Sequence, residues 1–310
     1  MAKEYDFIAA GHPNIYTGES REFKIYFSEP EAGVNENTGM LLLIAGYGGH
    51  AESKVYKKMR RKFADEYNLV CVQCDYFGFE FMQLEVLGET TQNFNDMSVM
   101  QALDNLTALL MVAAILKDNN LSFNTKKIIA YGNSHGAYLG HLCNVYAPEL
   151  FSLLIDNAGY LYPVYLEDTH TRYLNVINKD GKQEKIDFNY IVKRKSLRMK
   201  RELIDLNMLY ENYENKCSIV TFQWVKDHIV DAAEKKKFCN SIKKCLHVRI
   251  ESADGIIFKS DLHGDADYLQ LFDYTMHERK FGLDHSMALP QVNIGKFSID
   301  YSNEIPVFKK

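Results

Sequence analysis

The sequence predicts an α/β protein whose core is a mainly parallel β-sheet flanked by helices. Short β-rich runs recur along the chain with helical patterns between them, and this alternation is typical of parallel sheets. Several runs are continuously apolar, for example residues 41–45 and 128–130, as expected for strands covered by helices on both faces. The 310 residues, of which 46% are hydrophobic, suffice for one large core that carries an insertion.

Six runs have strand composition and are expected to form the parallel part of the sheet. They are residues 40–46, 69–74, 127–132, 152–157, 218–224 and 246–252. A further run at 21–27 alternates between polar and apolar residues, which predicts an antiparallel strand near the sheet edge. The segment from 96 to 117 has apolar residues close to a 3.6-residue period. It therefore predicts a long crossover helix that leads into the strand at 127–132.

Residues 159–217 interrupt the alternation of strand and helix patterns. They separate two strand-like runs by far more residues than a crossover connection needs. The interval begins with aromatic residues, passes a turn at 178–181 and continues as a charged helical stretch at about 190–213. We expect residues 1–158 and 218–310 to form the α/β core, and residues 159–217 to form an inserted helical lid. The tail after Pro290 alternates apolar and polar residues at 297–301, and either adds a strand or contacts another subunit.

Composition and charge narrow the class of protein. The chain carries 36 Lys and Arg against 41 Asp and Glu, a net charge of −5, which argues against nucleic acid as the main partner. The first residues lack an apolar signal core, and we expect no later run to reach the roughly 18 uncharged apolar residues of a membrane helix. These observations predict a cytoplasmic protein without membrane contact, and they are compatible with an oligomer.

The six cysteines lie mostly inside apolar runs, which favours reduced core thiols over a disulfide framework. Cys71 and Cys74 have the spacing of a redox or zinc pair. They fall in a strand-like run, however, and residues three apart in a strand point to opposite faces. We therefore expect both to be structural, and we predict no metal site in the chain.

The segment Gly132-Asn133-Ser134-His135-Gly136 has the G-x-S-x-G pattern. A buried strand run precedes it and a helical pattern follows it, which is the setting of a nucleophile elbow. The two glycines suit this turn, because the positions two before and two after the serine crowd each other and a Cβ there would clash. A plain strand-to-helix turn is the alternative. The pattern predicts Ser134 as a nucleophile.

The glycine-rich segment 45–50 follows directly on a strand run and has the chain position expected of an oxyanion loop. The backbone N–H groups of Tyr47 and His135 are the candidate oxyanion donors. Gly48 and His50 are candidate substrate contacts, and the His135 side chain is also expected to touch substrate. A phosphate-binding loop is the alternative, but the lysine of the Walker motif is missing.

A serine nucleophile needs a histidine base and a carboxylate to orient it, which in this arrangement follow late in the chain, the carboxylate first. Asp227 comes directly after the run at 218–224, so we expect it at the carboxyl end of that strand. His263 lies in a loop before a helical pattern and can reach a neighbouring strand end. Asp231 and Asp254 are the competing carboxylates. The competing late histidines lie inside a strand, inside a helix or beyond it: His247, His277 and His285.

The order Ser134, Asp227, His263, with 46–49 as the oxyanion loop, resembles the α/β-hydrolase superfamily over nearly the whole chain outside the lid. The resemblance implies the α/β-hydrolase fold and a serine-dependent esterase that requires neither a metal nor an organic cofactor. The same residues would serve an acyltransferase. A catalytically silent protein of this fold that binds a glycan or a partner is the alternative from a different class.

Three segments, 43–49, 58–68 and 132–136, look like a little-characterised bacterial family found among flagellin-glycosylation genes. This resemblance implies an esterase that acts on O-acyl groups of nonulosonic acids such as pseudaminic acid. One feature agrees, since residues 193–201 contain six cations, among which Arg194 and Arg198 are candidate contacts for an anionic acylated sugar. A solvated helix face balanced by nearby carboxylates is the alternative for this stretch.

Overall fold

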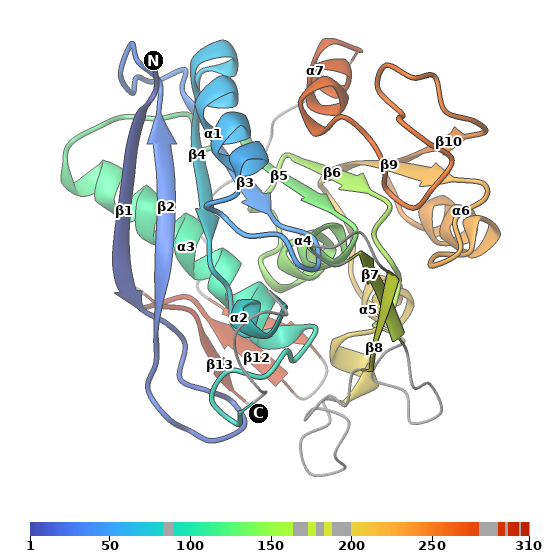
Figure 1. Ribbon diagram of the computed structural model, residues 1–310. Coiled ribbons are helices and arrows are strands. Elements are labelled where there is room, and N and C mark those ends of the chain that lie inside the picture. The colour runs from blue at the N-terminus through green and yellow to red at the C-terminus, as the bar shows by residue number, and fades with distance from the viewer. Residues whose placement is uncertain are drawn as a thin grey trace.

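The computed structural model is built on a central eight-stranded β-sheet (Figure 1). The described residues are 1–82, 90–163, 173–177, 183–187, 200–278, 291–294, 297–303 and 305–309. The strand order is β1-β2-β4-β3-β5-β6-β9-β10. The strands are β1 (Lys3–Ala10), β2 (Glu22–Glu29), β3 (Gly39–Ile44), β4 (Leu69–Cys74), β5 (Ile128–Asn133), β6 (Leu153–Asn157), β9 (Ser218–Trp224) and β10 (Cys245–Ile250).

The sheet is mainly parallel, as the sequence predicts. β2 pairs antiparallel with both β1 and β4, and every other neighbouring pair is parallel. Each of the six predicted parallel runs forms one of these strands, and the run at 21–27 forms β2. The edge strand β1 has no counterpart among the predicted strands. Most of its residues are exposed, Ile8 to 66%, so the strand lacks the apolar run that marks a buried one.

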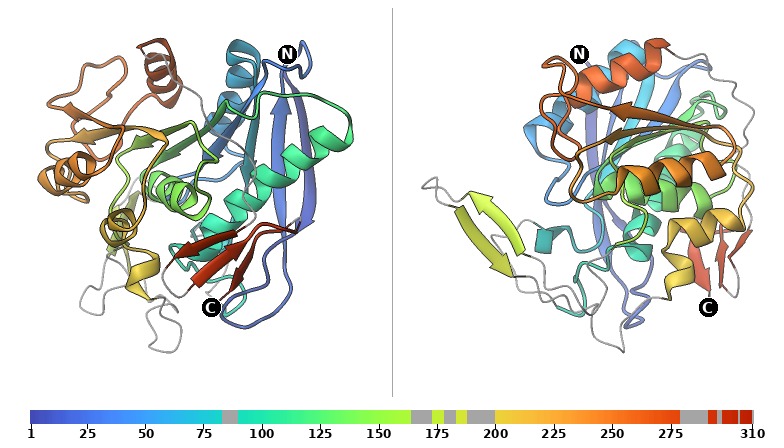
Figure 2. Two further views of the ribbon diagram at one scale, coloured as in Figure 1. Left: turned by 180° about the vertical axis from the view of Figure 1, so that it is seen from behind. Right: turned by 90° about the vertical axis from the view of Figure 1, so that its right-hand side faces the viewer.

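Helices cover both faces of the sheet (Figure 1 and Figure 2). α1 (Lys54–Tyr67) and α7 (Tyr268–Glu278) lie together on one face, where the rings of Phe63 and Phe272 stack at 4.0 Å. α3 (Val99–Asp118), α4 (His135–Tyr146) and α6 (Ala232–Ser241) lie on the other face. A single turn, α2 (Phe79–Met82), follows β4. The predicted crossover helix is α3, which begins three residues later than expected, and the Asp96 carboxylate before it accepts the N–H groups of Ser98 and Met100.

α3 also corrects one expectation. By length and composition it is apolar enough to cross a membrane, although we expected no such segment. In the structure, 78% of its apolar stretch is buried inside the protein, where it packs against the sheet and α4. A mostly apolar, mostly buried helix is typical of the core of a large domain, and α3 occupies that position here with a few buried polar residues such as Gln101 and Asp104.

The cysteines are free thiols, and all except Cys245 are buried. Cys71 and Cys74 both lie in β4 and are fully enclosed. The Cys74 sulfur lies 3.7 Å from the side-chain oxygen of Asn105 in α3. Among the described residues, no group of three or more His, Cys, Asp and Glu could hold a metal ion.

The interval at 159–217 differs in part from the expected helical lid. Its described residues form an antiparallel pair, β7 (Tyr173–Ile177) with β8 (Gln183–Asp187), then a single turn η4 (Arg201–Leu203) and the short helix α5 (Leu206–Glu211). The run at 173–177 contains Tyr, Val and Ile, which favour strands. The predicted turn at 178–181 and most of the charged stretch lie outside the described residues.

The carboxyl-terminal tail forms a separate small sheet, in line with the first of its two expected roles. Its strands are β11 (Gln291–Ile294), β12 (Phe297–Asp300) and β13 (Val307–Lys309), paired antiparallel. The Tyr301 hydroxyl donates to the Tyr146 carbonyl at the end of α4 (2.9 Å). The backbone N–H of Phe308 donates to His12 Nε2 (2.8 Å), so the tail is attached to the amino-terminal part of the chain.

A fully buried ion pair joins α6 to the centre of the sheet. Lys235 Nζ lies 2.7 Å from Asp156 Oδ2 at the end of β6, and both side chains are inaccessible to solvent. His141 and Thr221 also hydrogen-bond to that oxygen (3.0 and 3.1 Å). Burial raises the pKa of Asp156, but the Lys235 charge and the hydrogen bond with His141 outweigh it and hold the pKa below its ordinary value. The carboxylate is therefore charged and depends on its partners.

We predict that Lys235→Met lowers the free energy of unfolding by about 3–5 kcal/mol, because it leaves a buried carboxylate without its cation. Urea unfolding followed by circular dichroism measures this difference. Lys236→Met is the matched control, since Lys236 is exposed on the same helix, and we expect it to change stability by less than about 0.5 kcal/mol. Equal unfolding midpoints for the two variants would contradict the prediction.

Candidate active site

The candidate site lies where the strand order reverses. From β3 the chain moves outward to β4 on one side, whereas β5 and β6 continue on the other side of β3. The carboxyl ends of strands at such a switch point are where α/β sheets commonly bind ligands. The expected oxyanion loop at 46–49 follows β3, and Ser134 follows β5. The topology thus brings together two segments that lie almost ninety residues apart in the sequence.

Ser134 occupies a strained turn between β5 and α4. Its φ of 52° and ψ of −116° are unusual for a residue with a side chain. A Cβ on Gly132 would lie 2.3 Å from the carbonyl oxygen of Gly136, and a Cβ on Gly136 would lie 2.2 Å from that of Ile44. Both glycines are therefore required by close backbone approach, as the sequence predicts. The Ser134 N–H donates to the Asn157 carbonyl (2.8 Å), which ties the turn to β6.

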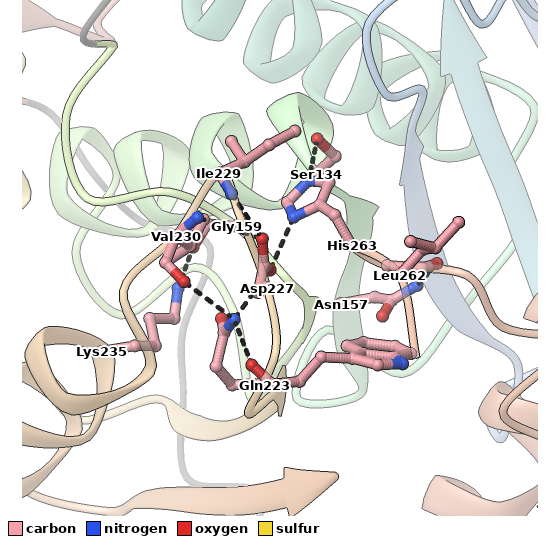
Figure 3. Close-up of polar contacts among 12 residues, drawn as sticks. Ser134, Asn157, Gly159, Gln223, Asp227, Ile229, Val230, Lys235, Leu262 and His263 are labelled. Atoms are coloured by element: carbon pink, nitrogen blue, oxygen red, sulfur yellow. Dashed lines mark hydrogen bonds and ion pairs between the residues drawn. The ribbon is translucent and has the colours of Figure 1, made fainter. Parts of the chain in front are cut away.

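A continuous chain of hydrogen bonds joins Ser134, His263 and Asp227 (Figure 3). His263 Nε2 lies 2.7 Å from Ser134 Oγ, and His263 Nδ1 lies 2.7 Å from Asp227 Oδ2. The carboxylate can only accept, so Nδ1 carries the ring proton and donates it in a hydrogen bond to Asp227, and Nε2 of the neutral ring is left to accept a hydrogen bond from the Ser134 hydroxyl. The Asp227 side chain is fully buried and that of His263 is 9% exposed.

Backbone and side-chain donors hold the Asp227 carboxylate. Its Oδ1 accepts the N–H groups of Ile229 (2.8 Å) and Val230 (3.1 Å), and its Oδ2 accepts Gln223 Nε2 (2.8 Å). Burial raises the pKa of Asp227, but the hydrogen bond and charge of His263 and the backbone N–H groups of Ile229 and Val230 together outweigh burial, so the pKa lies below its ordinary value. Asp227 is therefore an anion beside His263 at neutral pH.

The competing carboxylates and histidines lie away from Ser134 or have other hydrogen-bond partners, as far as the structure describes them. Asp231 caps α6 by accepting the N–H groups of Ala233 and Glu234, and Asp254 accepts three N–H groups of its own loop. His247 lies in β10, His277 is exposed on α7, and His285 is outside the described residues. Of the candidates that the structure describes, it brings together Ser134, His263 and Asp227.

Two asparagines that the sequence analysis did not single out hold the His263 loop. Asn157 Nδ2 donates to the carbonyl of Gly264 (3.1 Å) and to Asn133 Oδ1 (2.7 Å), and Asn133 Nδ2 donates to the Tyr268 hydroxyl (2.6 Å). Gly264 has a φ of 64°, and a Cβ there would lie 2.9 Å from Asn133 Oδ1. Their positions at the ends of β5 and β6 are the sequence signal that could have indicated this role.

The loop after β3 is held close to the elbow. The Gly46 N–H donates to the Tyr56 hydroxyl (3.2 Å), and a Cβ on Gly46 would lie 2.8 Å from the Asn133 carbonyl. Tyr47 is half-buried, with its ring edge-on to the His135 ring at 6.4 Å. Further along this loop, Gly48 is exposed and His50 is half-buried.

His135 opens α4, and the first N–H groups of a helix have no intrahelical acceptor. Together with the helix dipole, they favour developing negative charge. The position of the His135 N–H at the start of α4 therefore suits the predicted oxyanion donor, and the role of the Tyr47 N–H stays a prediction.

The His135 side chain does not take its expected place. It is fully buried, with Nε2 2.6 Å from Gln101 Oε1 and Nδ1 bonded to the Tyr160 hydroxyl. Burial lowers the pKa of His135 to about 3, so the ring is neutral. The expectation that this side chain touches substrate is wrong, because every residue of α4 is enclosed and its first side chain enters the core.

Arg194 and Arg198 lie outside the described residues, and Lys200 and Arg201 are the described members of the basic stretch. Arg201 Nε lies 2.8 Å from Asp205 Oδ2, and its guanidinium lies 4.4 Å from the centre of the Tyr162 ring. Arg201 is thus paired with a neighbouring carboxylate. At this position the structure agrees with the alternative for the basic stretch, a helix face balanced by nearby carboxylates.

Comparison with known proteins identifies the fold. Residues 81–201 match the model of a family described as a protein of unknown function (DUF2920). No curated protein matches the chain. Est1E from Butyrivibrio proteoclasticus with bound ferulic acid is similar in structure, with a TM-score of 0.53 and 17% identity over 83% of this chain and 93% of that one.

Two further structures agree with this likeness. Thermogutta terrifontis esterase 2 phosphoramylated by tabun gives a TM-score of 0.53 and 15% identity over 87% of this chain and 94% of that one. Pyrococcus horikoshii acylaminoacyl peptidase gives 0.58 and 13% over 93% of this chain but 43% of that longer one. The chain has the α/β-hydrolase fold, which confirms the predicted fold class.

The neutral state of His135 predicts a pH dependence of stability. Because its pKa is lower in the folded than in the unfolded chain, the unfolded chain binds the proton first as the pH falls from about 6.5 to about 3. The stabilisation present at neutral pH is lost across that window. We predict that, between pH 7 and 5, the wild type loses about 2 kcal/mol more stability than His135→Gln.

Urea unfolding at pH 7, 6 and 5 measures this difference. His277→Gln replaces an exposed histidine of α7 and controls for the substitution itself. A gap between wild type and His135→Gln that stays constant from pH 7 to 5 would show that the ring is not held neutral.

Proposed function

We propose that this chain is a serine-dependent carboxylic ester hydrolase that acts through an acyl-enzyme on Ser134. The observation that carries the proposal is the hydrogen-bonded chain from Ser134 through His263 to the anionic Asp227. It lies at the carboxyl ends of the strands, at the point where the strand order reverses, which is a common ligand-binding position in α/β sheets. Esterases are among the proteins with similar structures, which supports the same reaction class.

In the first step, His263 Nε2 takes the Ser134 proton while Oγ attacks the ester carbonyl carbon. The negative charge that develops on the carbonyl oxygen is stabilised by the backbone N–H groups of His135 and Tyr47. Asp227 stabilises the imidazolium that forms and keeps the ring in orientation. When the tetrahedral intermediate collapses, His263 gives the proton to the leaving alkoxide, and the acyl group remains on Ser134.

In the second step, His263 removes a proton from a water molecule, which attacks the acyl-enzyme carbonyl. A second tetrahedral intermediate forms, and its collapse releases the carboxylic acid and returns the proton to Ser134. An alcohol in place of water would make the same residues an acyltransferase. The strained backbone at Ser134 argues against a silent binding protein, since such strain costs about 1–3 kcal/mol and is typical of functional sites.

We further propose that residues 159–217 form a lid and that the substrate is an O-acetyl ester of an anionic sugar of the nonulosonic-acid type. The described ends of this segment pack beside α4, since the Tyr138 and Tyr146 hydroxyls donate to the Ile204 (2.7 Å) and Leu203 (2.5 Å) carbonyls. The six cations at 193–201 support an anionic substrate. Under both proposals, residues of the insertion select the substrate and residues of the α/β core carry out ester cleavage.

We predict that Ser134→Ala abolishes fluorophosphonate labelling and lowers kcat for p-nitrophenyl acetate at least about 10³-fold, because it removes the nucleophile. Labelling is measured by intact-protein mass spectrometry. Ser20→Ala, at an exposed serine, is the matched control and should label like the wild type. A folded wild type that takes no label, or a labelled Ser134→Ala, would contradict the proposal.

Substitution of the carboxylate extends this test. Asp227→Asn should lower kcat at least about 10³-fold while the protein stays folded, because the amide no longer stabilises the imidazolium. Asp231→Asn is the matched control, since asparagine caps a helix as well as aspartate does. Equal activity of these two variants would remove Asp227 from the proposed mechanism.

For the substrate, we predict that an O-acetylated nonulosonic acid has a kcat/KM about tenfold above that of its carboxyl methyl ester, because only the free acid can pair with a cation. Acetate release measures both rates. The difference should shrink in 0.5 M salt, which screens exposed charges. Equal values at low salt would exclude an anionic-sugar site and leave the esterase proposal intact.

A further inference from the structure

We propose that the buried His135 imidazole is a positioning residue, which fixes the backbone N–H of His135 as an oxyanion donor. This inference rests on the proposed function, because it concerns the oxyanion site of the same reaction. The side chain has no route to substrate, since it is enclosed on the core side of α4. Both of its ring nitrogens are nevertheless hydrogen-bonded, one towards α3 and the other towards the loop after β6.

The bond on the α3 side has a defined direction. Gln101 Nε2 donates to the Phe77 carbonyl (3.0 Å) and to Asn95 Oδ1 (2.6 Å), so its Oε1 must be the atom that faces His135. Oε1 can only accept a hydrogen bond, and His135 Nε2 therefore carries the ring proton. Because the ring is neutral, Nδ1 has a lone pair and accepts the Tyr160 hydroxyl. One tautomer of His135 satisfies both neighbours.

The residue before Tyr160 is fixed by hydrogen bonds at both of its backbone polar groups. The Gly159 N–H donates to Asp156 Oδ1 (2.7 Å), and its carbonyl accepts Lys235 Nζ, so the buried ion pair holds both of its polar groups. A Cβ on Gly159 would lie 2.8 Å from the Cβ of Ala137, which shows how closely this loop approaches the first turn of α4. The Tyr160 ring also stacks on that of Tyr138 at 4.8 Å.

These contacts form one path from α6 to the oxyanion site. Lys235 and Asp156 hold Gly159, the adjacent Tyr160 holds the imidazole, and the imidazole holds the backbone of His135. The first turn of a helix is otherwise prone to fray, because its N–H groups lack intrahelical partners. An oxyanion donor stabilises the transition state only if its distance to the developing charge is maintained within tenths of an ångström. A ring clamped at both nitrogens provides that precision.

The test compares two buried tyrosines whose rings are stacked. Tyr160→Phe removes the hydroxyl that holds His135, whereas Tyr138→Phe removes a hydroxyl that donates to the Ile204 carbonyl (2.7 Å). We expect Tyr160→Phe to lower kcat for p-nitrophenyl acetate about tenfold with KM unchanged, because the oxyanion forms only in the transition state. Tyr138→Phe should keep kcat within about twofold of the wild type, although both variants lose one buried hydrogen bond. Equal effects of the two substitutions on kcat would overturn the inference.

A second readout does not depend on turnover. In ¹⁵N spectra of the ring nitrogens, His135 of the wild type should show a proton on Nε2 and none on Nδ1 from pH 5 to 8. Tyr160→Phe should perturb the Nδ1 resonance and Tyr138→Phe should leave it in place. A protonated Nδ1 in the wild type would overturn the inference.

The rate of Ser134 labelling by a fluorophosphonate separates the two proposals. A wild type that does not react defeats the proposed function itself. A reactive wild type with an equally reactive Tyr160→Phe defeats the positioning role alone, and a roughly tenfold slower Tyr160→Phe supports it.

Discussion

The sharp turn at Ser134 is the constraint on which the rest of the structure depends. A serine with a φ of 52° costs about 1–3 kcal/mol and persists only where its surroundings determine it fully. Here the backbones of Gly132 and Gly136 meet without room for a Cβ, Gly136 lies against the end of β3, and the Ser134 N–H bonds to the end of β6. Three adjacent strands and α4 therefore share one packing point. Ser134 is itself half-buried, whereas its neighbours Gly132, His135 and Gly136 are enclosed.

Three enclosed groups around this turn differ in charge state because their partners differ. His135 is neutral because it is enclosed without a charged partner and both ring nitrogens are matched by neutral groups. Asp156 and Asp227 are equally enclosed but remain anionic, the first beside Lys235 and the second among N–H donors and His263. Desolvation acts on all three, and the partner decides the outcome. The site thus has one charged carboxylate at its reacting histidine and a neutral histidine behind its nucleophile.

Sequence patterns predicted the elements whose signal is local. Ser134 and Asp227 follow apolar strands directly, and parallel strands bring such residues to one edge, so their shared location follows from chain order. β1 was not predicted, because an exposed edge strand has no apolar run. β7 and β8 were not predicted, because the charged stretch that follows them suggested a helical segment. The direction of the His135 side chain was wrong for a different reason. The sequence does not distinguish a histidine that points towards substrate from one that points into the core. The direction of the His135 side chain is set by the packing of α4. Asn133 and Asn157 are likewise ordinary residues until two strands place them side by side.

The contacts of α4 link the chemistry to the insertion. Ser134 precedes its first turn, and His135 in that turn carries a candidate oxyanion donor. The Tyr138 and Tyr146 hydroxyls of the same helix donate to the Ile204 and Leu203 carbonyls, where the 159–217 segment returns to the core. The same segment leaves the core through Gly159 and Tyr160, which press on that first turn. Both described ends of the insertion are therefore attached to one helix. The Gly159 and Tyr160 end contacts the backbone and the imidazole beside the nucleophile, so substitutions at these two residues act on the position of the His135 N–H. Loss of the Tyr138 hydroxyl contact at Ile204 leaves that path in place, which is why the two ends differ in their expected effect on catalysis.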